Sequence, residues 1–255
     1  MAGAIIARML LHEAVATPDA KRRYVRTLFA TIADRYDLIT VVLSYGRDRA
    51  WKERLVRMAA VRPGLRVLDL ATGTGDIAYL LHDAGAEVVG LDLTERMIQL
   101  ARAKRPSGPR PLFLTGDMSA LPFADGSFDL VTTGYGLRNV PVLPTALDEI
   151  ARVLAPSGRL LSLDFNRPSN AVVRSAYLAY LTVVGGTLGW LLHRDPDTYR
   201  YIPASIRQYP GGEGVVRLLR DRGYASARWF PVLGGLMAIH DATTGSVRPP
   251  RTDIH

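Results

Sequence analysis

A glycine-rich loop is the first feature of this chain that could do chemistry. Residues 73–78 read Gly-Thr-Gly-Asp-Ile-Ala, which fits the pattern G-x-G-x-x-G/A after an apolar run and at the start of a predicted helix. Glycines let the backbone approach a ligand closely, and the N-terminus of a helix favours negative charge. The loop therefore predicts a nucleotide-like ligand, and two kinds of ligand compete for it.

One candidate ligand is a nicotinamide or flavin dinucleotide, whose ribose is held by an acid at the end of the next strand, where Asp92 stands. The other is S-adenosylmethionine, which has a ribose and an adenine but no phosphate. Three features favour the second ligand. Asp69 lies inside the strand just before the loop, Asp117-Met118 follows the third strand, and the loop at 121–129 precedes the fourth. In this order they resemble the pattern of class I methyltransferases.

This pattern assigns a role to each predicted cofactor contact. The loop glycines bring the backbone against the methionine half, and the Asp92 carboxylate accepts from the two ribose hydroxyls. Asp117 and Met118 hold the adenine by a hydrogen bond and an apolar contact. Asp69 either organises the loop or holds the ligand's ammonium group through water. The predicted cofactor-binding residues are Asp69, Gly73, Thr74, Gly75, Asp92, Leu93, Asp117, Met118 and Gly134.

Further segments resemble the quinone C-methyltransferases of menaquinone and ubiquinone biosynthesis. Residues 36–51 are similar to the first signature of that family, and Gly-Leu-Arg-Asn-Val at 136–140 resembles its most distinctive motif. Residues 152–165 resemble its second signature, 199–210 its substrate-side segment and 234–240 its ending. The resemblance covers most of the chain.

The chain departs from the family pattern mainly on the substrate side. Ile39 and Thr40 stand where the family has Met-Asn, and Asp48 stands where it has His. Residues 155–158 read Ala-Pro-Ser-Gly instead of Lys-Pro-Gly-Gly, and Asp164 replaces Glu. These changes bear on which quinone is used and leave the cofactor half untouched.

The resemblance implies C-methylation of a reduced polyprenyl quinol, with demethylmenaquinol as the favoured substrate. The quinol carbon becomes nucleophilic when a hydroxyl loses its proton, so some group must accept or relay that proton. Arg138 and Asn139 are the implied catalytic pair. Because arginine stays protonated, we favour electrostatic stabilisation of a quinolate by Arg138, against the alternative that it pairs with an acid to fix its loop. Tyr45 and Tyr201 are further substrate-binding candidates, as is Asp48, against the favoured alternative that each belongs to the core or the rim of the pocket.

Other functions remain open from the sequence. The polyprenyl methoxy-benzoquinol of ubiquinone synthesis is the nearest alternative substrate. N-methylation of a small amine or phospholipid headgroup would need an aromatic cage or acids for the cationic product. A non-catalytic scaffold of a quinone-synthesis complex and a dinucleotide oxidoreductase are the remaining hypotheses. The sulfonium already activates the methyl group, so no metal is required, and the five histidines have no metal-ligand spacing.

Strands alternate with helices through most of the chain, which predicts an α/β fold with a parallel sheet. The resemblance makes this a Rossmann-like class I methyltransferase fold with seven strands, mostly parallel, and an antiparallel last strand. Helices are expected before residue 62, with a break at 37–45. The predicted single domain, 1–241, comprises a helical N-terminal cap (1–61), a cofactor-binding core (62–165), a helical lid insertion (166–210) and a C-terminal helix and strands (211–241); residues 242–255 form a predicted disordered tail.

Composition limits the setting in which the chain works. It has 255 residues, no cysteine and a net charge of +8, with no basic run long enough for a nucleic-acid arm, so nucleic acid is not expected as a partner. Residues 171–192 are long and apolar enough to span a bilayer. We favour a lid whose Tyr177, Tyr180 and Trp190 touch the membrane surface, over a buried helix or a true span. The expected location is cytoplasmic and peripheral to the membrane, and a homodimer is compatible with the resemblance.

Overall fold

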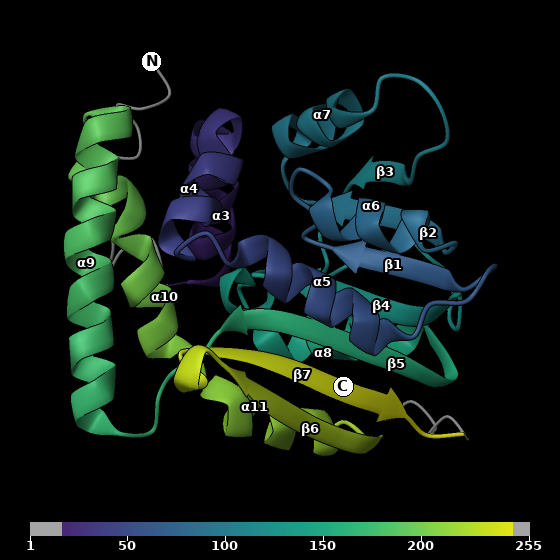
Figure 1. The fold of residues 1–255 in the computed structure, drawn as a ribbon. Helices are drawn as coiled ribbons and strands as arrows, with labels where there is room; N and C mark the ends of the chain where they lie inside the picture. The colour runs from purple at the N-terminus through teal and green to yellow at the C-terminus, as the bar shows by residue number, and fades with distance from the viewer. Residues whose placement is uncertain (1–16, 247–255) are drawn as a thin grey trace.

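A seven-stranded sheet runs through the computed structural model, which describes residues 17–246 (Figure 1). The strand order is β3 (Leu112–Thr115), β2 (Glu87–Asp92), β1 (Arg66–Leu70), β4 (Phe128–Gly134), β5 (Leu154–Phe165), β7 (Met237–Thr244) and β6 (Tyr224–Val232). In this sheet β7 runs antiparallel to both of its neighbours, and all other pairs are parallel. The predicted fold class is confirmed, with the last strand inserted between β5 and β6.

Helices cover both faces of the sheet. The apolar sides of α5 (Asp48–Ala59), α6 (Asp76–Asp83) and α7 (Glu95–Lys104) bury residues such as Leu55 and Ile98 against one face. The apolar sides of α8 (Leu143–Val153) and α11 (Gly211–Arg220) bury residues such as Ile150 and Val215 against the other. Because the strands between them are buried on both faces, the carboxyl ends of β1, β2 and β4 carry the loops open to a ligand.

A helical layer covers those strand ends. It begins with α3 (Pro18–Ile32), which is capped by the Thr17 hydroxyl accepting from the Ala20 amide at 3.2 Å. A short 3-10 turn, η1 (Ala33–Arg35), leads into α4 (Tyr36–Leu43). The predicted break at 37–45 is therefore wrong over most of its length. Its β-branched residues are poor helix formers, and burial of Ile39 and Leu43 stabilises the helix.

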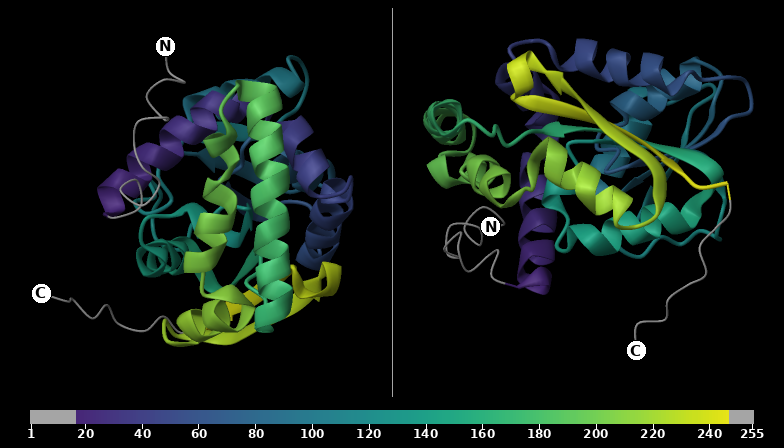
Figure 2. Two further views of the ribbon diagram at one scale, coloured as in Figure 1. Left: turned by 90° about the vertical axis from the view of Figure 1, so that its left-hand side faces the viewer. Right: turned by 90° about the horizontal axis from the view of Figure 1, so that it is seen from below.

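The lid insertion packs beside this layer (Figure 2). It contains α9 (Ala171–His193), the 3-10 helix η3 (Pro196–Tyr199) and α10 (Tyr201–Gln208). Tyr199 and Tyr201 bury their rings among the apolar residues of α3 and α4. Of the described helices, α9 is long and apolar enough to cross a membrane, with 28% of its most apolar stretch buried.

The chain end differs from the prediction. Residues 242–244, expected in a disordered tail, continue β7 and pair with β5 and β6. Ala242 is fully buried there, because β5 is long enough to offer backbone partners up to that point. The remaining predicted tail from residue 247 lies outside the described residues.

Candidate active site

Asp92 and the glycine-rich loop are joined by backbone hydrogen bonds. One Asp92 carboxylate oxygen accepts from the Gly73 amide at 2.9 Å, and the other accepts from the Thr94 amide at 2.8 Å. Burial raises the pKa of Asp92 to about 6, against the effect of these bonds. The Thr94 side chain also bonds to this carboxylate, and the lone pair that remains can accept from a ribose hydroxyl.

A first cavity opens beside Asp92, at the carboxyl end of β2. Its walls include six of the predicted cofactor residues, namely Gly73, Asp92, Leu93, Asp117, Met118 and Gly134. One Asp117 carboxylate oxygen accepts from the Ser119 amide at 2.8 Å. The other forms an ion pair with Arg22 of α3 at 2.8 Å. The N-terminal layer therefore forms part of the cofactor cavity.

The other three predicted cofactor residues lie differently. Thr74 and Asp69 border a smaller adjoining cavity, together with Lys52 and Asp76. Asp69 accepts from the hydroxyls of Thr72 at 2.6 Å and Thr132 at 2.7 Å, and burial raises its pKa to about 6. These bonds make it a brace of the loop.

Gly75 borders none of the described cavities. Its φ of +87° places it at the N-cap of α6, where a Cβ would meet the Phe113 ring at 3.0 Å. A glycine is thus required at position 75 by the positive φ of the turn and by the close packing of the Phe113 ring.

A second cavity, of about 590 Å³, lies between α3, α4 and the lid. Most of its walls are apolar or aromatic, and it shares Phe29, Tyr36 and Tyr135 with the first cavity. Ile39 and Thr40, which depart from the quinone-family pattern, also line it. The two cavities are therefore neighbours, and ligands in both would contact the same three aromatic rings.

Arg138 and Asn139, on the 3-10 turn η2 (Leu137–Asn139), border different cavities. Arg138 lines the second cavity, and its guanidinium donates to Asp164 at 3.1 Å and to the carbonyl of Tyr135 at 2.8 Å. Asn139 lines the first cavity and donates to the same carbonyl at 2.8 Å. Its buried side-chain oxygen has no hydrogen-bond partner among the described residues. Arg138 is thus both paired with an acid and open to a substrate.

Of the two predicted substrate tyrosines, one lines the second cavity and the other does not. Tyr201 lines the second cavity, and its buried hydroxyl has no hydrogen-bond partner within residues 17–246. Tyr45 does not line it. The Tyr45 side chain is 56% exposed and stacks on Tyr180 of α9, with ring centroids 5.6 Å apart. The Tyr45 backbone has a φ of +54° and follows α4 and the C-cap residue Ser44.

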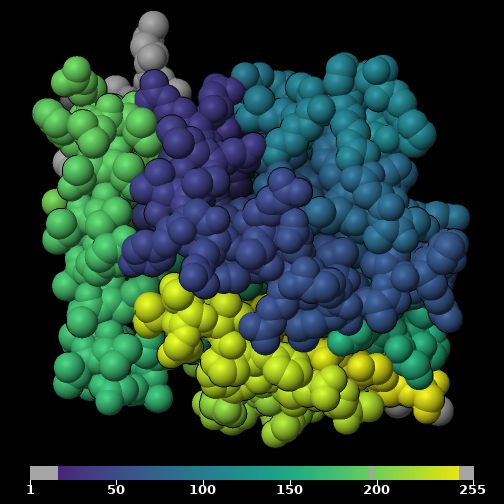
Figure 3. Space-filling model, in the orientation of Figure 1, coloured from purple at the N-terminus to yellow at the C-terminus, as the bar shows by residue number. Residues whose placement is uncertain are grey.

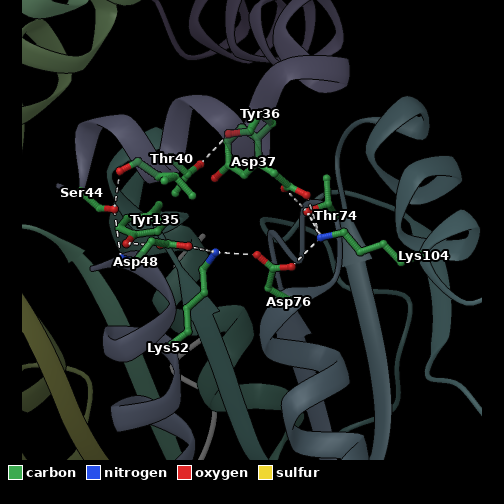
Figure 4. Close-up of polar contacts among 11 residues, drawn as sticks. Tyr36, Asp37, Thr40, Ser44, Asp48, Lys52, Thr74, Asp76, Lys104 and Tyr135 are labelled. Atoms are coloured by element: carbon green, nitrogen blue, oxygen red, sulfur yellow. Dashed lines mark hydrogen bonds and ion pairs between the residues drawn. The ribbon is translucent and has the colours of Figure 1, made fainter. Parts of the chain in front are cut away.

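A polar network that the sequence reasoning missed links α4 and α5 to the glycine-rich loop (Figure 4). The Tyr135 hydroxyl donates to Asp48 at 2.7 Å, and Lys52 joins Asp48 at 2.5 Å to Asp76 at 2.8 Å. On the far side, Lys104 pairs with Asp76 at 2.5 Å and with Asp37 of α4 at 2.9 Å, and Thr74 donates to Asp37 at 2.6 Å. The spacing of these residues in the chain gives no signal that they meet. No group of three or more metal-ligating side chains occurs in the described part of the chain.

Known proteins of one family resemble this chain over most of its length. The model of the ubiE/COQ5 methyltransferase family matches residues 17–244. The chain belongs to this family. It is 41% identical over 216 residues to the demethylmenaquinone methyltransferase of Thermus thermophilus, covering 84% of this chain and 98% of that protein. It is 37% identical to the ubiquinone/menaquinone biosynthesis C-methyltransferase UbiE of Teredinibacter turnerae, covering 91% and 95%.

Solved structures agree on the fold. The magnesium protoporphyrin IX methyltransferase of Synechocystis, with bound S-adenosylhomocysteine, superposes with a TM-score of 0.62 at 20% identity and covers 88% of this chain and all of that one. A possible histamine N-methyltransferase of Thermotoga maritima gives a TM-score of 0.63 at 19% identity, covering 86% and 99%. This protein is an S-adenosylmethionine-dependent methyltransferase. Its first cavity suits that cofactor, because Asp92 has a spare lone pair for a ribose and the buried Asn139 oxygen lacks a partner.

Proposed function

We propose that this methyltransferase methylates a ring carbon of demethylmenaquinol, giving menaquinol. One observation carries the proposal: an aromatic, apolar cavity with a buried guanidinium meets the cofactor cavity at Phe29, Tyr36 and Tyr135. An apolar ring with ionisable hydroxyls fits such a cavity, whereas a cationic amine would face the positive charge of Arg138. The names of the Thermus and Teredinibacter relatives support the same substrate class.

The chain's own residues position the substrate and stabilise its charge. S-adenosylmethionine supplies a methyl group already activated by its sulfonium. Arg138, held in place by Asp164 and lying 4.8 Å from the centre of the Phe165 ring, offers a fixed positive charge in a buried site. A quinolate oxygen near it is stabilised without reorganisation of the site, which is the usual source of electrostatic catalysis. The apolar and aromatic side chains that make most of the walls lower the local polarity, which strengthens the interaction of Arg138 with that charge.

The head group is decided by a direct assay. Purified protein is incubated with labelled S-adenosylmethionine and either demethylmenaquinol or a prenylated methoxy-benzoquinol, both kept reduced, and the products are identified by mass spectrometry. We expect C-methylation of demethylmenaquinol and little reaction of the oxidised quinone, which cannot form a quinolate. Methylation of the benzoquinol alone would move the enzyme to ubiquinone synthesis. Transfer to neither quinol would refute the proposed function.

The lid helix α9 carries a stripe of exposed apolar side chains. On α9, Val172, Val183 and Trp190 follow one another after three and two helical turns, so they lie along one stripe. Their exposed fractions are 78%, 68% and 54%. The lid and α4 lie side by side on this part of the molecule (Figure 3), joined by the stack of Tyr45 on Tyr180.

This apolar stripe docks on the lipid bilayer that holds the insoluble polyprenyl chain of the substrate. Exposed leucine and valine residues of α4 extend the apolar surface, and the net charge of +8 favours an anionic leaflet. Tyr177, predicted to face the membrane, is instead buried and donates to the Leu236 carbonyl at 3.3 Å. It packs the lid onto the core.

Vesicle flotation tests this docking. We expect binding to phosphatidylglycerol vesicles, weaker binding to phosphatidylcholine, and loss of binding in Val183→Ser/Trp190→Ser. Leu112→Ser is the matched control, because Leu112 is equally exposed, at 57%, on the edge strand β3. Equal flotation of the double variant and the wild type would refute the α9 surface.

A further inference from the structure

Asp48 is a buried carboxylate next to the substrate cavity but outside its walls. Its side chain is 8% exposed, and it lies at the start of α5, where its amide donates to the Ser44 hydroxyl at 3.0 Å. One carboxylate oxygen accepts from the Tyr135 hydroxyl at 2.7 Å, and the other contacts Lys52 at 2.5 Å.

Tyr135 connects this acid to both ligands. Its side chain is 7% exposed and borders the cofactor cavity, the substrate cavity and the smaller cavity by the glycine-rich loop. Burial, followed by the charge of Asp48, raises the pKa of Tyr135 well above its ordinary value. The phenol therefore stays protonated, donates to Asp48, and keeps a lone pair that can accept a proton from a hydroxyl in the substrate cavity.

Among residues 17–246, a single cation lies against the Asp48 carboxylate. Lys52 is shared with Asp76, so Asp48 is compensated by a cation that is itself divided between two acids. The remaining facing groups are Tyr36 of α4 and, beyond Tyr135, the Arg138–Asp164 pair. Arg138 is always protonated and so cannot take the proton itself.

We propose that Tyr135 and Asp48 form a proton relay that deprotonates the quinol hydroxyl during methyl transfer. This inference rests on the proposed quinol substrate. The quinol hydroxyl gives its proton to the Tyr135 oxygen as the phenol proton moves to Asp48. The ring carbon then bonds to the methyl group while the methyl–sulfur bond breaks, and the sulfur keeps the bonding pair.

The proton balance closes after transfer. The methylated ring carbon loses its hydrogen as a proton to solvent and regains aromaticity. The quinolate oxygen recovers its proton from Asp48 through Tyr135, which resets the relay. One proton is released per methyl group transferred, as the overall reaction requires.

Three substitutions test the relay, with kcat, KM for the quinol and affinity for S-adenosylhomocysteine measured across pH. Tyr135→Phe removes a single hydroxyl and is the decisive variant, because the ring and its packing remain. We expect kcat to fall about 100-fold, in the range of general acid–base catalysis, with S-adenosylhomocysteine affinity within about twofold of the wild type. The remaining rate should rise with hydroxide concentration, since solvent must take the proton.

Asp48→Asn should show the same loss. Asp48→His should restore much of the rate and move the acidic limb of the kcat profile toward neutral pH, because an imidazolium loses its proton at higher pH than a carboxylic acid. Tyr224→Phe is the matched control, since Tyr224 also has a buried hydroxyl but lies at the start of β6, away from the described cavities. Thermal unfolding checks that each variant is folded.

The outcomes separate the two proposals. A wild type that methylates neither quinol overturns the proposed function and the relay together. An active wild type with Tyr135→Phe within twofold in kcat overturns the relay alone. The same holds if Tyr135→Phe lowers kcat with an unchanged pH profile, because a purely structural hydroxyl would do that.

Discussion

We expect Asp92→Asn to weaken cofactor binding while leaving the free energy of unfolding nearly unchanged, because the substitution makes two opposite contributions to stability. The pKa of Asp92 is about 6 in the folded chain, against 3.8 ordinarily, so its ionisation at about pH 8 disfavours folding by about 3 kcal/mol. Asparagine removes that cost. Its NH₂ group must instead face the amide of Gly73 or Thr94, which leaves one buried donor unsatisfied and costs about 1–3 kcal/mol. The net change in the free energy of unfolding is therefore within about 2 kcal/mol.

Cofactor affinity should change much more than stability. The variant loses a charged acceptor for a ribose hydroxyl, worth about 1.5–3 kcal/mol, so S-adenosylhomocysteine should bind about 10- to 150-fold more weakly. Isothermal titration calorimetry measures this, and urea unfolding measures stability. Asp83→Asn is the control, because Asp83 forms an exposed ion pair with Arg105 away from the cavities. Unchanged affinity in Asp92→Asn would refute the assignment of Asp92 to the ribose.

The same carboxyl predicts a pH dependence. Only the ionised Asp92 is a charged acceptor for the ribose, so wild-type affinity should fall about tenfold for each pH unit below about 6, more steeply than in Asp92→Asn. Between about pH 4 and 6 the folded chain binds more protons at this site than the unfolded chain. The free energy of unfolding without ligand should therefore decrease as pH rises through that window, and the variant should lack this contribution.

Four further substitutions address the loop, the buried ion pair and the N-terminal layer. Gly73→Ala and Gly75→Ala both place a side chain at positive φ, at about 1–2 kcal/mol. Both should lower the melting temperature by a few degrees. Gly73→Ala should in addition weaken S-adenosylhomocysteine binding at least tenfold, whereas Gly75→Ala should lower the melting temperature further, because its Cβ meets an aromatic ring at 3.0 Å. Asp164→Asn leaves the Arg138 charge without its buried counter-ion, and urea unfolding should show a loss of about 3–5 kcal/mol; a loss below about 1 kcal/mol would contradict this. Lys104→Met removes a partly exposed cation between two acids, so stability should change by less than about 1 kcal/mol. Stopped-flow release of S-adenosylhomocysteine should become several-fold faster, and an unchanged rate would show that this contact does not hold α4 in place.

The strands and the cofactor loop could be predicted because their signals are local. Apolar runs such as 66–70 and 87–92 end at the glycine-rich loop and at Asp92, and parallel strands bring such ends together. The helix α4 could not be predicted, because its Thr-Val-Val sequence disfavours a helix and no side chain caps it. Only the burial of Ile39 and Leu43 under the lid explains it.

Site residues that depend on distant partners were the least predictable. Asp48 and Tyr135 are 87 residues apart, and nothing in either neighbourhood indicates their hydrogen bond. A tyrosine at position 45 could hydrogen-bond a quinol oxygen, but its ring is largely exposed and stacks on Tyr180 of the lid, a contact that only the packing of α9 determines. Arg138 was recognised from its motif, and its pairing with Asp164 required the register of β5 against β4.

The shared wall of Phe29 and Tyr36 has a consequence for the order of events in turnover. Both residues belong to the N-terminal helices, which Arg22–Asp117 and Lys104–Asp37 fasten to the core over the cofactor. A quinol seated against the same rings resists the displacement that cofactor exchange requires. Steady-state kinetics should therefore follow a compulsory sequence, with S-adenosylmethionine entering first and S-adenosylhomocysteine leaving last. A high quinol concentration should then trap the spent cofactor and slow the enzyme.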